Sequence, residues 1–171
     1  MKKYFSLFLS FLGFSCAAPH IALETQESFD IKKYMGKWYE IARLPNTFEE
    51  GLEENTAYYE LRENGDVTVI NQGRVVADKS RYKQVKGRAW VPDPNEPSKL
   101  KVSFFWPFAG DYWVLSVDKD YTIALVGDPA REYLWILARE RDPDPKVVSE
   151  LKAYASSLGY AVENMISGLA D

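Results

Sequence analysis

The chain has 171 residues and a formal net charge of −4, a length that suits one domain with a short extension. Hydrophobic residues make up 46% and aromatic residues 15%, enough for a sizeable core and a pocket lining. Interspersed Lys and Arg residues form no basic stripe, which argues against a nucleic-acid partner. One Cys and one His exclude an intrachain disulfide and a zinc site of Cys and His ligands. We therefore expect no catalytic residues, no metal and no cofactor.

Residues 1–15 predict a bacterial lipoprotein signal peptide. Two Lys residues precede the apolar run Tyr4 to Phe14, which is too short to span a membrane as a helix. Cys16 follows this run, and the arrangement resembles signals in which the Cys is lipidated and becomes the mature N-terminus. Gly13 departs from the pattern, which usually has Leu three residues before the Cys. Cleavage near Ala17 or Ala18, giving a soluble periplasmic or secreted protein, is the alternative.

Lipidation of Cys16 predicts firm anchoring, because several attached acyl chains together make membrane binding stable. Ala17 is not the Asp that usually retains such lipoproteins in the inner membrane. The resemblance therefore implies attachment to the periplasmic face of the outer membrane. Residues 16–29 would form the lipidated N-terminus and a tether with little periodicity, and residues 30–171 would form the folded domain.

Eight short segments rich in β-branched or aromatic residues predict β-strands. They cover residues 37–44, 55–63, 66–73, 81–91, 99–105, 111–118, 121–127 and 133–140. Turn chemistry separates them: Asn64-Gly65 is a two-residue hairpin signal, and the segment from Pro92 to Pro97 cannot continue a strand. Strands in succession with hairpin-sized gaps predict an antiparallel up-and-down barrel, wide enough for one small ligand.

After residue 143 the pattern becomes that of a helix. Asp144 is a candidate N-cap, Pro145 takes the first helical position, and Gly159 supplies the stop. Apolar residues recur between them at helical spacing, at Val147, Leu151, Tyr154 and Leu158. We expect this helix to pack its apolar face on the outside of the barrel, followed by a short strand within residues 160–166.

Three motifs in this order resemble the lipocalin family, most closely its bacterial outer-membrane members. They are Gly36 with Trp38 in the first strand, Asp120 with Tyr121 in the turn after the sixth strand, and Arg139 at the end of the eighth. The resemblance covers residues 30 to about 166. It implies an all-β fold, with an eight-stranded antiparallel up-and-down barrel and a C-terminal α-helix packed outside. It further implies structural roles for these residues, with Trp38 across the closed end and Arg139 over its ring.

The resemblance and strand alternation together predict which residues line the barrel. If Arg139 points inward, so do Leu137 and Trp135, with Trp135 nearer the mouth. The resemblance adds Tyr59, Asn71, Phe104 and Tyr112 by position, and alternation adds a neighbouring Val to three of them. The expected ligand-binding residues are Tyr59, Val69, Asn71, Val102, Phe104, Tyr112, Val114, Trp135 and Leu137. Simple core filling is the alternative role for Tyr59 and Phe104.

Two charged residues bear on the cavity. Some lipocalins carry an Arg near the mouth, and Arg74 stands one position early; alternation turns it outward unless a bulge at Gly73 turns it back. Head-group preference therefore stays open. Glu40 shares the parity of Trp38 and is expected to point inward near the floor. A buried carboxylate needs partners, which we expect to be backbone amides or a neighbouring side chain.

These residues predict a lipid-binding protein that holds a fatty acid such as palmitate, or a lysophospholipid, for storage or transport at the bacterial outer membrane. An apolar, aromatic lumen with two hydroxyls and an amide suits a long hydrocarbon with one polar end. One alternative is a protein- or membrane-interaction module, with a homodimer as one form of it, that acts through exposed aromatic residues in the loop 105–113. A lipocalin-type enzyme is disfavoured, because the predicted lumen contains neither Cys nor His.

Overall fold

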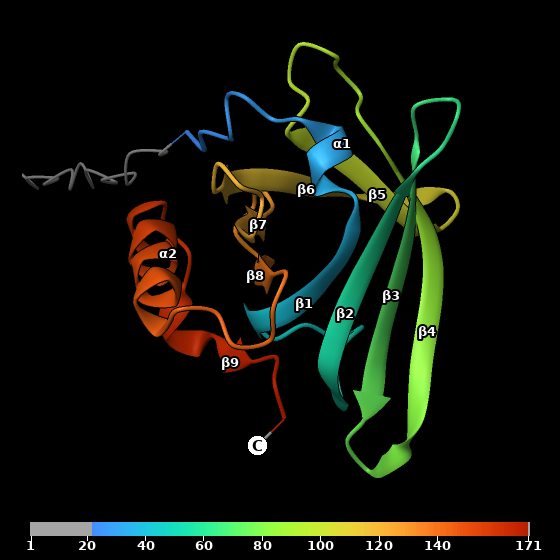
Figure 1. Ribbon diagram of the computed structural model, residues 1–171, viewed down its shortest axis with the longest axis vertical. Helices are drawn as coiled ribbons and strands as arrows, with labels where there is room; N and C mark the ends of the chain where they lie inside the picture. Colours follow the sequence, from blue (N-terminus) through green and yellow to red (C-terminus); the bar gives the residue numbers. More distant parts are fainter. Residues whose placement is uncertain (1–21, 171) are drawn as a thin grey trace, which may run out of the picture.

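Eight antiparallel strands close into a barrel in the computed structural model, which describes residues 22–170 (Figure 1). Each strand pairs with its neighbour in the chain, and β1 completes the ring by pairing with both β8 and β2. The strands are β1 (Gly36–Arg43), β2 (Leu52–Leu61), β3 (Val67–Val75), β4 (Asp78–Trp90), β5 (Lys99–Phe105), β6 (Phe108–Val117), β7 (Ile123–Gly127) and β8 (Leu134–Ala138). The predicted all-β barrel is confirmed. The predicted signal peptide and Cys16 lie outside the described residues.

None of the helices within residues 22–170 has the length and apolar character needed to cross a membrane.

The hairpin of β3 and β4 is longer than the sequence predicts. The predicted strands left a loop between residues 73 and 81, but Val75 pairs with Asp78 and only Val76 and Ala77 connect the two strands. Neither connecting residue carries turn chemistry, which is why the sequence pattern missed the continuation. The long hairpin extends one wall of the barrel at its open end (Figure 1).

The turn at Asn64 and Gly65 has three residues at its tip instead of the expected two. The Arg62 N–H donates to the carbonyl oxygen of Asp66 at 2.8 Å, which leaves residues 63–65 beyond the last pair. Gly65 has φ of +86°, a conformation that glycine adopts without strain. Such three-residue loops are the next most common hairpin connection after two-residue turns.

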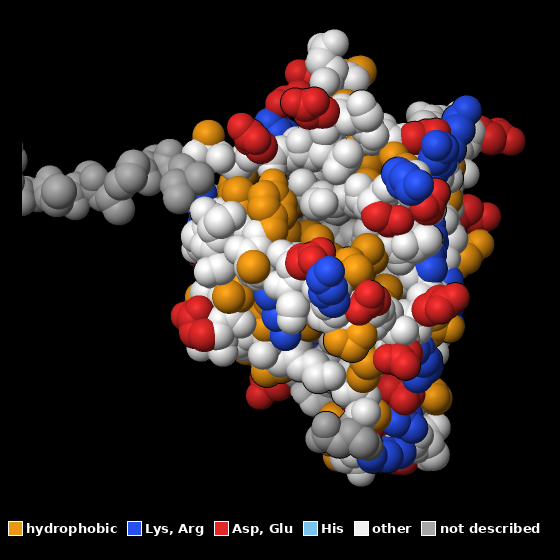
Figure 2. Space-filling view, turned by 60° about the vertical axis from the view of Figure 1, so that its left-hand side comes forward, with side chains coloured by type: hydrophobic (Ala, Val, Ile, Leu, Met, Phe, Trp, Pro, Cys, Tyr) orange, Lys and Arg blue, Asp and Glu red, His pale blue; other side chains and the backbone are white. Residues whose placement is uncertain are grey.

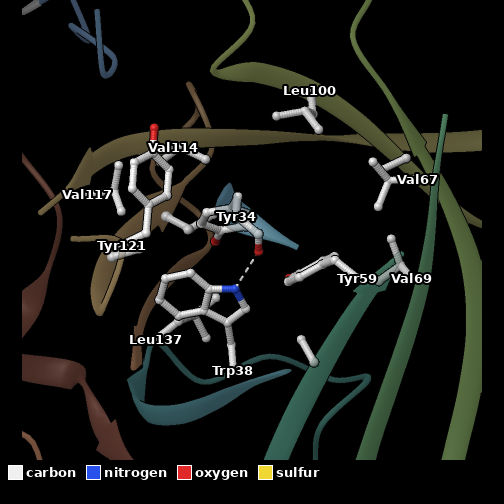
Figure 3. Close-up of a cluster of buried hydrophobic side chains, with 14 of the residues drawn as sticks. Tyr34, Trp38, Tyr59, Val67, Val69, Leu100, Val114, Val117, Tyr121 and Leu137 are labelled. Atoms are coloured by element: carbon white, nitrogen blue, oxygen red, sulfur yellow. Dashed lines mark hydrogen bonds between the residues drawn. The ribbon is translucent and has the colours of Figure 1, made fainter. Parts of the chain in front are cut away.

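A one-turn helix that the sequence analysis did not predict closes one end of the barrel. α1 (Ile31–Tyr34) begins after Asp30, whose carboxylate accepts a hydrogen bond from the Lys32 N–H at 2.9 Å. The Tyr34 ring lies 4.7 Å from the Trp38 ring, and the Tyr34 carbonyl accepts the indole N–H at 2.8 Å (Figure 3). Trp38 has no exposed surface, so these two side chains seal the floor.

Arg139, directly after β8, fastens this floor. Its guanidinium carbon lies 3.9 Å from the centre of the Trp38 ring, a cation–π contact. It also donates to four backbone carbonyls, those of Lys37 at 2.8 Å, Met35 at 2.8 Å, Lys33 at 2.9 Å and Tyr121 at 3.1 Å. Gly36 has φ of +95°, and a Cβ there would lie 3.4 Å from the guanidinium. One cation therefore ties together α1, β1 and the β6–β7 turn.

Asp118, rather than the predicted Asp120, organises the β6–β7 turn. The Asp118 carboxylate accepts hydrogen bonds from the backbone N–H groups of residues 120, 122 and 123. The Asp120 side chain is exposed and comes no nearer than 4.0 Å to a cation. Tyr121 is buried, and its hydroxyl accepts the Asp30 N–H at 2.6 Å. The turn thereby contacts the start of α1.

A helix packs on the outside of the barrel as predicted. α2 (Pro145–Ser157) begins after Asp144, whose side chain accepts from the Lys146 N–H at 2.8 Å. The helix lies over β7 and β8 (Figure 1), and every residue of β7 is buried. A second hydrophobic layer joins them, containing Leu115, Leu125, Leu134, Ile136, Ala155 and Leu158. After the turn η1 (Val162–Asn164), the short β9 (Ile166–Ser167) pairs with the end of β1.

Acidic and basic side chains lie intermingled on the face shown in Figure 2. That mixture agrees with the small net charge of the chain.

Replacing Arg139 by Met tests the role of the cation in the floor. We expect the free energy of unfolding to fall by roughly 3 kcal/mol, because the change removes the cation–π contact and leaves carbonyl groups without their donor. The matched control is Arg141→Met, since Arg141 is half exposed and pairs with Glu54 at 3.0 Å. That pair is worth less than about 1 kcal/mol. Equal losses in urea unfolding of the two variants would contradict the assigned role.

Candidate functional site

The barrel encloses a cavity of about 690 Å³, within the usual range for small-molecule sites. It begins at Tyr34 and Leu100 above the floor and reaches the surface at the exposed residues Lys83, Phe105 and Phe108. Figure 3 shows its deep end, where Tyr59 and two Val side chains of β3 face Tyr34. The wall is largely hydrophobic, so the cavity favours an apolar ligand.

Eight of the nine residues predicted to bind a ligand line this cavity. They are Tyr59, Val69, Asn71, Val102, Phe104, Tyr112, Trp135 and Leu137. They come from β2, β3, β5, β6 and β8, so the lining combines inward-facing positions of most of the barrel. Strand alternation identified the inward side correctly for these positions. Contact with a ligand at each of them stays a prediction.

Val114 does not line the cavity. It has no exposed surface and belongs to the hydrophobic cluster that also contains Trp38 and Tyr121 (Figure 3). Its side chain points inward as alternation predicts, but it lies at the level of the floor, where aromatic rings fill the barrel. Alternation gives the direction of a side chain and not its depth, which explains the error.

Three tyrosines form a hydrogen-bonded chain at the deep end of the cavity. The Tyr112 hydroxyl lies 2.8 Å from the Tyr34 hydroxyl and 2.8 Å from that of Tyr59. Burial raises the pKa of each of the three phenols above its ordinary value, so all three stay neutral. Three hydroxyl protons serve two hydrogen bonds among them, which leaves one proton available to a ligand oxygen.

Two amide oxygens in the cavity wall have no hydrogen-bond partner among the described residues. They are Oδ1 of Asn71 and Oδ1 of Asn55. Buried polar atoms in proteins nearly always have a partner. These acceptors therefore give the middle of the cavity a place for a donor from a ligand or from water.

Aromatic side chains gather on one side of the cavity mouth. The Tyr133 and Trp135 rings stack with centres 5.9 Å apart, and Phe48 lies 5.4 Å from Tyr133. Phe48 belongs to the acidic loop between β1 and β2 and is mostly exposed. The indole N–H of Trp135 donates to Glu49 of the same loop at 3.1 Å. Trp135 therefore links the cavity wall to the loop at its mouth.

Arg74 points away from the cavity, as alternation predicts. Its guanidinium pairs with Glu53 at 3.1 Å and with Glu54 at 3.2 Å, and it does not line the cavity. Lys83 of β4 lies in the lining instead and shares the parity of Val85. Lys83 is the one Lys or Arg side chain in the cavity lining of the described chain.

Glu40 points inward and bonds to neighbouring side chains, one of the two partner types that the sequence analysis left open. It lies toward the mouth loop and not near the floor as expected, because its partner Arg43 also approaches Glu49 of that loop. Arg43 donates to its carboxylate at 2.5 Å, and the Asn55 amide donates to it at 3.3 Å. Arg43 also lies 3.6 Å from the Glu49 carboxylate. Burial, with the nearby charge of Glu49, raises the pKa of Glu40 to about 8 against the opposing effect of Arg43. The positive charge of Arg43 and a proton on Glu40 thus balance the two carboxyl groups of Glu40 and Glu49.

A family model described as a lipocalin-like domain matches residues 29–169. The chain belongs to the lipocalin family. The outer membrane lipoprotein Blc of Escherichia coli K12 is 41% identical over 159 residues, covering 92% of this chain and 89% of that protein. Temperature-induced lipocalin-1 of Arabidopsis thaliana is 34% identical, with 84% and 80% covered. Apolipoprotein D of Macaca fascicularis is 37% identical, with 88% and 79% covered.

Solved structures with lower identity share the fold of this lipocalin. Insecticyanin from the tobacco hornworm Manduca sexta superposes with a TM-score of 0.69 at 21% identity, covering 88% of this chain and 85% of that one. The cockroach allergen Per a 4 superposes with a TM-score of 0.66 at 20% identity, covering 88% and 94%.

Three polar residues of the lipocalin cavity and its mouth were missed in the sequence. Tyr34 lies before the first predicted strand, and only its place four residues before Trp38 could have drawn attention. Arg43 is separated from Glu40 by a register shift in β1, so simple alternation places the two on opposite faces. Lys83 could have been found from its parity with Val85 and Ala89 in a strand that begins early.

The raised pKa of Glu40 predicts that the lipocalin loses stability as pH rises. The folded pKa of about 8 exceeds the ordinary value of 4.5, so between these values the unfolded chain holds fewer protons than the folded one. We expect the free energy of unfolding to fall by roughly 2–4 kcal/mol between pH 5 and 8.

Glu40→Gln should remove most of this dependence, because the amide keeps the shape of the side chain and does not ionise. The matched control is Glu60→Gln at an exposed position of β2. Urea unfolding of each variant across the pH range measures the slope. A slope that survives in Glu40→Gln would show that another group causes it.

Proposed function

We propose that this lipocalin binds a fatty acid or a lysophospholipid in its barrel, without catalysis, for storage or transport at the bacterial outer membrane. The observation that carries the proposal is the apolar cavity of about 690 Å³ with a closed floor and an open mouth. Each buried methylene group contributes about 0.8 kcal/mol. A long acyl chain therefore gains several kcal/mol even after the cost of ordering it.

The polar groups of the cavity support a ligand with one polar end. In the proposed pose the acyl chain runs past Val69, Val102 and Phe104 toward the floor, and the head group stays at the mouth. In this pose Lys83, which lines the cavity, would meet a carboxylate or a phosphate, and it has no ion-pair partner among the described residues. A hydroxyl of a lysophospholipid glycerol would suit the free oxygen of Asn71.

The proposed location rests on the relatives and on the N-terminal sequence. The similar proteins of Escherichia coli and Vibrio cholerae are named outer membrane lipoproteins. In this chain, lipidation of Cys16 would anchor the barrel to the periplasmic face of that membrane through the tether before residue 30. Cleavage after Cys16 would instead give a soluble periplasmic or secreted carrier of the same ligands.

Titration with lipids, followed by tryptophan emission, tests the proposed function. We expect palmitate and a lysophospholipid to change the emission saturably, with dissociation constants in the micromolar range or lower. Trp135→Phe should remove most of the signal, because Trp135 lines the cavity.

Trp113→Phe is the matched control. Trp113 lies on the neighbouring barrel surface, packs against the outer hydrophobic layer and does not line the cavity. Its variant should keep the full lipid-dependent change. A folded protein that shows no saturable response to any acyl lipid would refute the proposed function.

A further inference from the structure

The hairpin between β5 and β6 presents three exposed aromatic side chains, here called the aromatic tip. Phe105, Trp106 and Phe108 are 73%, 83% and 77% exposed. Phe105 pairs with Phe108, so only Trp106 and Pro107 form the connection. Isolated exposed apolar residues are common, but three large rings on one short turn mark an interaction surface.

The strand β4 concentrates positive charge beside this tip. Its thirteen residues contain one acid, Asp78, and five cations: Lys79, Arg81, Lys83, Lys86 and Arg88. Arg81, Lys83 and Lys86 form no ion pair with any residue that the structure describes. The chain as a whole carries a net charge of −4. The basic strand is therefore a local feature of this side of the barrel.

The aromatic tip and β4 form one continuous surface around the cavity mouth. On the outer face, Trp106, Lys86 and Arg88 line a shared hollow. On the inner face, Phe105, Phe108 and Lys83 line the rim of the cavity. Rings and cations thus lie together on both faces of the rim.

The pairing of β4 leaves this side of the wall open. β4 pairs with β5 only from Arg88 to Trp90, so residues 78–87 have β3 as their strand partner and none on the β5 side within the described chain. The cavity reaches the rim between this half of β4 and the aromatic tip, because both contribute to its lining. A lipid that enters or leaves here would pass directly between the rings and the cations.

Three acids in and after the loop between β1 and β2 carry counterions, whereas the exposed Glu50 has none within the described residues. Glu53 and Glu54 pair with Arg74, and Glu54 pairs also with Arg141. Glu49 lies 3.6 Å from Arg43. Repulsion of an anionic surface from that side is therefore reduced, and the unpaired cations of β4 dominate the field near the tip.

We propose that the aromatic tip and β4 dock on an anionic phospholipid membrane and hold the cavity mouth against it. Trp and Phe side chains insert at the boundary between head groups and acyl chains, and Lys and Arg near an anionic surface add attraction. A second copy of this chain is a poorer occupant, because a two-fold interface over this patch would place the cations of β4 against each other.

Quenching of tryptophan emission by brominated lipid tests this docking in the full chain. The protein is mixed with vesicles of phosphatidylethanolamine and phosphatidylglycerol that contain a brominated phospholipid. We expect strong quenching that Trp106→Phe largely removes and Trp113→Phe leaves in place. Vesicles of phosphatidylcholine alone should quench less, and added salt should reduce quenching by the anionic vesicles.

Two double variants distinguish the effect of the cations of β4 from the effect of the net charge of the chain. Arg81→Gln with Lys86→Gln should lower the quenching of Trp106 at limiting lipid, through an affinity that is roughly ten-fold weaker. Lys119→Gln with Lys146→Gln changes the net charge equally at exposed sites away from the tip and should have no effect. Equal behaviour of the two double variants, or quenching that Trp106→Phe leaves unchanged, would overturn the proposal. So would cross-linking of two copies through the tip without quenching.

The docking proposal and the proposed lipid-binding function can fail separately in these experiments. Saturable binding of palmitate that depends on Trp135, without quenching at Trp106, would remove the docking surface and leave lipid binding intact. Quenching at Trp106 in a protein that binds no free acyl lipid would support the docking surface and refute the proposed lipid binding.

Discussion

The contact between Arg139 and Trp38 is the constraint on which the barrel depends. Burial lowers the pKa of Arg139, so a cation at this place needs compensation. It receives the face of the Trp38 ring and four backbone carbonyls, three from residues 33–37 and one from Tyr121. These two regions are far apart in the sequence, and the guanidinium holds them in one geometry. The floor is closed because that geometry also brings Tyr34 against Trp38.

A closed floor makes the remaining interior a cavity. Aromatic rings fill the barrel up to the chain of hydroxyls formed by Tyr34, Tyr112 and Tyr59, and above it the wall combines aliphatic and aromatic side chains with a few polar ones. The tyrosines end the filled part with neutral hydroxyls bonded to one another, so the hollow part can stay apolar without an unpaired charge at its base. Near the mouth, Arg43 and a proton balance Glu40 and Glu49. The structure thus places charge beside the cavity without leaving an unneutralised carboxylate in it.

Much of the fold could be predicted from the sequence, because it rests on local signals. Alternation of side chains, turn residues and the helix start at Asp144-Pro145 predicted the eight strands and α2. The missed features depend on contacts that no local pattern carries. The β3–β4 connection lacks turn residues, and α1 is a single turn stabilised by the floor it closes.

The residues that line the cavity could be predicted wherever the direction of the side chain alone decides whether it does so. Tyr59 and Trp135 follow from alternation and family resemblance, whereas Val114 fails because its depth is set by the packing around Trp38. The buried partner of Glu40 could not be found, since the register shift in β1 brings Arg43 to the same side. The basic side of the mouth was also missed, because the cations of β4 alternate with polar residues and gather only when the strand is extended beside the aromatic tip.

The central claim is that an acyl lipid lies inside the barrel, and methyl NMR during a palmitate titration tests it most directly. The account predicts saturable shifts of the methyl signals of Val69 and Val102, which line the cavity. Signals of Leu125 and Leu134 in the outer hydrophobic layer should stay in place. Shifts confined to the outer layer, or none at Val69 and Val102, would contradict the account.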